Sequence, residues 1–286
     1  MNSLFLLSLI AHILGDFLFQ SNAIAKGRSS SDYEGFTRLK RSCVFNGIHS
    51  ITHGLTLYIL IKIIDKTSHI KSDKLFLLLI CICTCHFFID ILKPFLVNLP
   101  KNIESLINSV FQKIQLGTFS LNTNEDRINL IVFILDQIFH LGSIILIFDL
   151  LYNFNLNDLY NLIVNIKTTN YVHEKVLAII YILLICTFEA AYFSKFLLNS
   201  IKTVPYTNSN NEANRGGFLI GILERLFIIL GIVLNHATAI ALVLTLKSIA
   251  RYKKFDNDSF TEYYIIGTFL SFVIAIIGGV CISNII

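Results

Sequence analysis

The sequence has 286 residues, of which 54% are hydrophobic and only 15% charged, and its mean hydropathy is +0.68. Because soluble domains contain about 25% charged residues, this composition excludes an ordinary soluble enzyme and indicates a chain that crosses a membrane several times. The net charge of +4 is small and spread over predicted loops, which argues against a nucleic-acid-binding protein.

Eight segments of the chain are apolar enough to be interpreted as membrane-spanning helices, each of about 20 residues. The first carries no basic region ahead of its apolar run, so we interpret it as a retained span and not as a signal peptide. The sixth and seventh are separated because their joint apolar run is too long for one crossing, and a hairpin turning at Asn235 and His236 fits better. The predicted spans are 2–20, 44–64, 75–97, 128–151, 173–199, 217–234, 236–251 and 261–285.

Two further segments, 103–114 and 156–166, carry apolar residues at helical spacing in a polar background. They are predicted to be amphipathic helices lying on the membrane surface. The sequence therefore predicts an all-α, polytopic transmembrane bundle with about eight spans and one or two interfacial helices. Within this single membrane unit, residues 1–152 are expected to carry the ligands of a metal site, and residues 153–286 to complete its pocket.

The orientation in the lipid bilayer follows from the positive charges of the loops. Thirteen Lys and Arg residues follow the odd-numbered spans, and four follow the even-numbered spans. Because positively charged loops remain in the cytoplasm, both termini are predicted to lie outside it, in a bacterial inner membrane. The oligomeric state is left open.

Histidine and aspartate recur four positions apart in the first four predicted spans. Residues at this spacing share one face of a helix, and the predicted topology brings all four pairs into the cytoplasmic half of the membrane. A charge at mid-membrane costs at least about 2.5–3.5 kcal/mol, whereas a divalent ion would compensate the carboxylates and bind neutral imidazoles. The pairs are His12 and Asp16, His49 and His53, His86 and Asp90, and Asp136 and His140.

These eight residues are predicted to bind one or two divalent ions. Zinc is the first expectation, because imidazole and carboxylate suit it, and iron or manganese would accept the same ligands. Gln20, Asn46 and Gln137 are candidates for groups that orient the ligands or a substrate. Two alternatives stay open: Asp–His hydrogen bonds that only hold the bundle together, and a proton relay.

The C-terminal half carries a second set of charges, which includes Glu224, Arg225 and Lys247. One interpretation is ion pairing between helices, such as Glu224 with Lys247. The other is a cationic clamp for an anionic head group, built from Lys93, Arg225 and Lys247 beside the metal.

The favoured function is a metal-dependent hydrolase acting on an amphiphilic, anionic phosphate or ester substrate near the cytoplasmic leaflet. In this hypothesis Asp136 serves as a base, and Arg225 or Lys247 stabilises developing negative charge. Whether the protein is an enzyme is left open. A metal- or proton-coupled transporter using the same His and Asp residues, and a non-catalytic membrane effector or scaffold, are the alternatives.

Four sequence segments, in this order, resemble a known family: HILGDFLFQ, HSITH, HFFIDILK and DQIFH. They are similar to an uncharacterised bacterial membrane family, the domain-of-unknown-function family numbered thirty-three hundred and seven. The resemblance covers roughly residues 1–150, and the later segments GFLIGILERLF and EYYIIGTFLS look like segments of its longer members. It implies a polytopic bacterial protein and implies no substrate.

Overall fold

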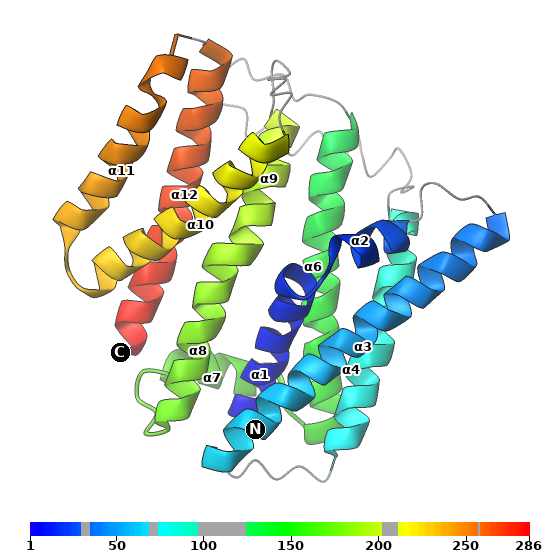
Figure 1. The fold of residues 1–286 in the computed structure, drawn as a ribbon. Coiled ribbons are helices and arrows are strands. Elements are labelled where there is room, and N and C mark those ends of the chain that lie inside the picture. Colours follow the sequence, from blue (N-terminus) through cyan, green and yellow to red (C-terminus); the bar gives the residue numbers. More distant parts are fainter. Residues whose placement is uncertain (30–34, 69–73, 97–123, 202–210, 257) are drawn as a thin grey trace. The chain divides into compact units, whose positions relative to one another are not determined.

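The computed structural model describes residues 1–29, 35–68, 74–96, 124–201, 211–256 and 258–286 (Figure 1). These residues form helices joined by short turns, with no strand in the described part of the chain. The prediction of an all-α protein is therefore confirmed. The predicted amphipathic helix 103–114 lies outside the described residues.

Five helices are long and apolar enough to cross a membrane, which supports the prediction of a membrane protein. The N-terminal segment meets the same criterion only as a bent pair, Asn2–Leu18 with Asn22–Arg28, whose two parts meet at 91°. The predicted number of about eight spans is not confirmed. The five candidate spans are Leu39–Ile64, Leu75–Lys93, Asp126–Tyr152, Val172–Ile201 and Phe260–Ile285.

The chain divides into two compact units, and the division into halves predicted at residue 152 stays a prediction. The first unit contains Met1–Leu96 and Ile134–Leu184, and the second contains residues 124–133 and Ile185–Ile286. The described helices of the first unit are α1 (Asn2–Ile13), η1 (Leu14–Leu18), α2 (Asn22–Ser29), α3 (Gly35–Ser68), α4 (Leu75–Leu96), most of α6 (Asn124–Tyr152), α7 (Leu156–Asn165) and α8 (Val172–Leu184).

Helix α1 is the centre of the first unit, because it contacts both α3 and α8 and almost all of its side chains are buried. An apolar helix without a polar face is expected to lie inside a protein or a membrane. Phe5 of α1 packs edge-on against Phe148 of α6, with 5.2 Å between ring centroids, and against Phe154, at 4.9 Å. The predicted amphipathic helix 156–166 is observed as α7, and a capping box between Asn155 and Asp158 fixes its start.

The second unit is built around a helical hairpin, in which α10 (Asn211–Val233) contacts both α11 (Ala237–Arg251) and α12 (Asp258–Ile285). Figure 1 shows α10 and α11 joined at a sharp turn. Asn235 has a positive φ of 56° there, so the chain reverses where the sequence predicts it. The unit also contains η2 (Ile185–Glu189), α9 (Ala190–Ile201) and η3 (Tyr252–Lys254).

Candidate metal centre

A break in the first predicted span brings Asp16 to the site. After α1 ends at Ile13, the backbone continues as a π-helical turn, η1, which contains Gly15 and Asp16. Such turns occur frequently at functional sites. Gly15 is required here, because a β-carbon at this position would overlap the imidazole of His53. The absence of a side chain lets α3 come close enough for its histidines to reach Asp16.

Four ligand atoms converge at this point, contributed by Asp16, His49, His53 and His86, and all lie within 4.8 Å of one another. Oδ1 of Asp16 lies 3.0 Å from Nε2 of His49, 3.3 Å from Nε2 of His53 and 3.7 Å from Nε2 of His86. The two α3 nitrogens are themselves 3.3 Å apart. Ligands that lie about 2.0–2.1 Å from a tetrahedral zinc ion are separated by roughly 3.3 Å, so these separations fit a single ion.

A second group continues from the first through His86, which it shares. His86, Asp90 and His140 also offer ligand atoms within 4.8 Å of one another. Oδ2 of Asp90 lies 3.4 Å from Nε2 of His86 and 3.8 Å from Nε2 of His49. The i, i+4 pair on α4 therefore connects both groups.

The remaining two predicted ligands adjoin these groups. The imidazole of His12 lies 5.0 Å from that of His140 between centroids, and its Nε2 is 3.6 Å from Oδ2 of Asp16. Oδ1 of Asp136 is 3.6 Å from Nδ1 of His140. The structure thus brings all eight predicted residues into one cluster, the His/Asp centre, with six of them in the two ligand groups.

Several buried polar atoms of the His/Asp centre have no hydrogen-bond partner among the described residues. A buried donor or acceptor without a partner costs about 1–3 kcal/mol, so five in one cluster require an explanation. A divalent cation fits their chemistry, since carboxylate oxygens and unprotonated ring nitrogens are all electron-pair donors. The atoms are His49 Nδ1, His86 Nε2, His140 Nε2, Asp90 Oδ2 and Asp136 Oδ1.

Two cations hold the outer oxygens of the carboxylates. Arg28 of α2 donates from Nη2 to Oδ1 of Asp90 and from Nε to Oδ1 of Asn46, the second bond being 2.8 Å long. Lys93 of α4 donates from Nζ to Oδ2 of Asp136 at 2.6 Å. Each of these carboxylates therefore gives one oxygen to a cation and turns the other toward the imidazoles.

Gln20 links this outer layer to the π-helical turn. With its amide oxygen facing α2, it accepts from Nη1 of Arg28 at 2.5 Å, and its amide nitrogen donates to the main-chain oxygen of Asp16 at 3.1 Å. Gln20 and Asn46 thus contact the centre through Arg28, and their role in orienting ligands or a substrate stays a prediction. For Gln137 the described residues provide no hydrogen bond to the centre.

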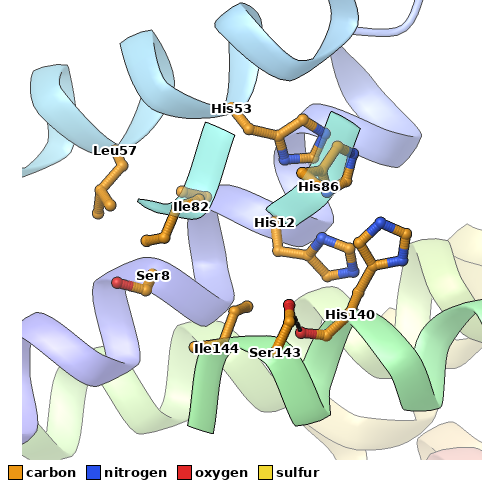
Figure 2. A pocket seen from close by; sticks show the side chains of 10 residues that line it. Ser8, His12, His53, Leu57, Ile82, His86, His140, Ser143 and Ile144 are labelled. Carbon is orange, nitrogen blue, oxygen red and sulfur yellow. Dashed lines mark hydrogen bonds between the residues drawn. The ribbon is translucent and has the colours of Figure 1, made fainter. Parts of the chain in front are cut away.

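A small cavity of about 10 Å³ lies beside the imidazoles, with room for about one water molecule. Figure 2 shows the rings of His12, His53, His86 and His140 gathered at one end of it, while Leu57, Ile82 and Ile144 occupy the other. Apolar side chains therefore lie at the end of the cavity away from the imidazoles. Ser143 also lines the cavity, and its hydroxyl donates to the main-chain oxygen of His140 at 2.8 Å.

The comparison with known families decides which family the chain represents. The family described as "protein of unknown function (DUF3307)" matches residues 4–166, which is more than half of the chain. The chain belongs to the DUF3307 family. No curated protein and no solved structure matches it.

The DUF3307 match contains every residue of the His/Asp centre, together with Arg28 and Lys93, and ends before Arg225 and Lys247. Those two residues belong to the second unit and have partners there. Arg225 donates to the main-chain oxygen of Thr187 at 2.9 Å and to the hydroxyl of Ser271 at 3.3 Å. Lys247 pairs with Glu224 at 2.7 Å, as the ion-pair interpretation expects. A role for Arg225 or Lys247 beside the metal stays a prediction.

Arg28 is the residue of the site that the sequence did not single out. It lies in a Ser-rich stretch that resembles a loop, and only the reversal of α2 against α3 brings it to Asp90. A basic residue soon after the end of an Asp-containing span is the one signal that could have identified it.

Proposed function

We propose that this DUF3307 protein is an integral membrane, metal-dependent hydrolase that acts on an amphiphilic phosphate or ester. The observation that carries the proposal is the single oxygen of Asp16, which faces three imidazole nitrogens at 3.0–3.7 Å. One charged carboxylate oxygen and three neutral imidazole nitrogens form a set of donors that suits a divalent ion.

Asp16, His49, His53 and His86 are the proposed ligands of the first ion, with zinc expected and iron or manganese accepted by the same donors. A bound divalent ion would make water reactive at neutral pH and stabilise developing negative charge. His12 and His140 line the cavity that has room for one water molecule. Asp136 is the proposed base, since its Oδ1 is buried beside His140 and has no hydrogen-bond partner among the described residues.

The proposed location is a bacterial inner membrane, crossed about eight times with both termini outside the cytoplasm. In this arrangement α10 and α11 are additional crossings, and the His/Asp centre lies near the cytoplasmic leaflet. The excess of Lys and Arg in the loops after odd-numbered spans supports this orientation.

A transporter would use the same residues as transient sites along a path open at both ends. The apolar residues Leu57, Ile82 and Ile144 at the far side of the cavity favour a closed site over such a path (Figure 2). A non-catalytic scaffold would need no ion at all. Metal content therefore separates the favoured function from the scaffold most directly.

The test is elemental analysis of the protein purified in detergent, beside the double variant His49→Ala/His53→Ala. We expect one or two tightly bound zinc, iron or manganese ions per chain, and none in the variant. The double variant His173→Ala/His236→Ala is the matched control, because it removes two histidines outside the centre. An unaltered helical circular dichroism spectrum shows that each variant folds. A native protein that binds no metal even after reconstitution would overturn the proposal.

A further inference from the structure

The side chains in and around the His/Asp centre differ in exposure. The side chains of His49, His53, His86, Asp90, Asp136 and His140 are at most 5% exposed. In contrast, Asp16 and His12 are 11% exposed, Arg28 is 14% exposed and Lys93 is 35% exposed. Arg28 and Lys93 are thus more exposed than Asp90 and Asp136, the carboxylates that they contact.

Among the described residues, both cations retain donors beyond those that hold the carboxylates. A guanidinium has five N–H donors and an ammonium three. Arg28 contacts one oxygen each of Asp90, Asn46 and Gln20, and Lys93 contacts one oxygen of Asp136. Each cation is thus held in place while part of its hydrogen-bonding capacity remains for a ligand.

The charges of the site favour an anion. Its three carboxylates, Asp16, Asp90 and Asp136, exceed the two cations by one negative charge. A single divalent ion turns this deficit into a surplus of one positive charge, and a second ion would increase the surplus. An anionic ligand is therefore favoured at either ion count, and a neutral ester would leave the surplus uncompensated.

Exposed apolar side chains lie within a few residues of Gln20 and of Lys93 in the chain. Leu18 and Phe19, just before Gln20, are 46% and 50% exposed, and Phe88 and Leu92 on α4 are 60% and 56% exposed. Phe88 and Leu92, on the same helix as Lys93, offer exposed surface for hydrocarbon. An anionic head beside an apolar chain is the composition of an amphiphile.

We propose that Arg28 and Lys93 bind the phosphate group of an amphiphilic phosphate monoester and deliver it to the His/Asp centre. This inference rests on the proposed function and narrows its substrate class from phosphate or ester to phosphate. Guanidinium and ammonium groups both recognise phosphate oxygens. In the reaction the oxygen of water bonds to phosphorus and the ester P–O bond breaks. One proton of that water leaves with the alcohol, and the other remains on the released phosphate.

The experiment uses the full chain in detergent, loaded with Mn²⁺ and titrated with inorganic phosphate, with ³¹P line broadening as the readout. Phosphate bound beside the paramagnetic ion is expected to broaden strongly and saturably, beyond a control with free Mn²⁺ at the same concentration. Lys93→Gln is expected to retain the ion and weaken phosphate binding by about 10- to 100-fold, the loss of one hydrogen bond between charged groups. Lys74→Gln is the matched control, since this lysine lies at the opposite end of α4 and is expected to bind phosphate as the native protein does.

A second arm distinguishes an amphiphile from free phosphate. Dihexanoyl phosphatidic acid, a soluble phosphate monoester with acyl chains, is expected to displace inorganic phosphate at a lower concentration than phosphate itself requires. Equal potency would overturn the amphiphile part of the proposal.

The outcomes separate the two proposals. A chain that binds neither Mn²⁺ nor zinc nor iron contradicts the proposed function, and for a chain that binds zinc but not Mn²⁺ the competition is repeated with the zinc-loaded protein. A chain that binds Mn²⁺ without saturable phosphate broadening overturns the phosphate inference alone, and so does equal weakening by Lys74→Gln and Lys93→Gln. The titration of the native protein alone decides whether phosphate binds beside the ion, so the test remains if Lys93→Gln fails to fold. In that case Lys93→Arg measures whether a retained positive charge keeps the affinity for phosphate.

Discussion

Each unit contains a π-helical turn, and the two turns have opposite outcomes. In the first unit, η1 brings Asp16 into a cluster of imidazoles in which one nitrogen each of His49, His86 and His140 has no hydrogen-bond partner among the described residues. In the second unit, the main-chain oxygen of Thr187 in η2 accepts a hydrogen bond from the buried guanidinium of Arg225. In the second unit, a cationic side chain thus binds the π-helical turn, whereas the site around the turn of the first unit contains more carboxylates than cations. A π-helical turn therefore presents candidate metal ligands in the first unit and accepts a hydrogen bond from an arginine in the second.

The largest expected effect on metal affinity comes from replacing a carboxylate in the first unit, compared with replacing one in the second unit. Asp16→Asn removes the central charged ligand with little change in size, so we expect the affinity for the ion to fall by at least about 100-fold. Glu224→Gln removes a buried carboxylate of the second unit and is expected to leave the affinity unchanged. Competition with a chromophoric chelator measures both. Equal losses in the two variants would mean that overall charge, and not the ligand set, governs binding.

An intermediate effect is expected from Arg225→Met. The substitution leaves the Thr187 carbonyl and the Ser271 hydroxyl without this donor, so we expect the free energy of unfolding in detergent to fall by about 1–3 kcal/mol. The metal content is expected to stay at the native level. Lys253→Met, an exposed position in the second unit, serves as the control. Loss of the ion in Arg225→Met would connect the second unit to the His/Asp centre and contradict the separate roles of the two units.

The smallest effect is expected from Ser143→Ala in the cavity beside the imidazoles. Its hydroxyl donates within α6 to the main-chain oxygen of His140, so the variant is expected to change the free energy of unfolding by less than about 0.5 kcal/mol and to keep the ion. The same chelator competition and unfolding titration apply. A clear loss of metal affinity would show that the cavity hydroxyl supports the ligands directly.

The eight residues of the centre could be identified from the sequence because an i, i+4 spacing fixes a common helix face wherever the helix lies. Because the same spacing recurs in four segments, the simplest interpretation was that the four helices bring their pairs to one place. The structure brings the eight side chains together. The hairpin at Asn235 was predictable for a similar reason, since helix length alone requires a break there.

The π-helical turn and the 91° bend after it could not be predicted in the same way. Apolar periodicity reports that a segment is helical, but one extra residue in a turn leaves the composition unchanged. Arg28 depends on that bend, so its contact with Asp90 was not accessible to pattern analysis. Prediction of the number of membrane crossings is limited for another reason. Helix α11 has 15 residues, and at this length the sequence is compatible both with a membrane crossing and with a helix on the membrane surface.

The position of the centre in the chain has a consequence for biosynthesis. Every ligand lies between His12 and His140, and the first unit ends at Leu184. A ribosome has therefore produced all the donor atoms by the time half of the 286 residues have been made. The proposed ion could therefore be loaded onto the nascent chain before the last hundred residues exist.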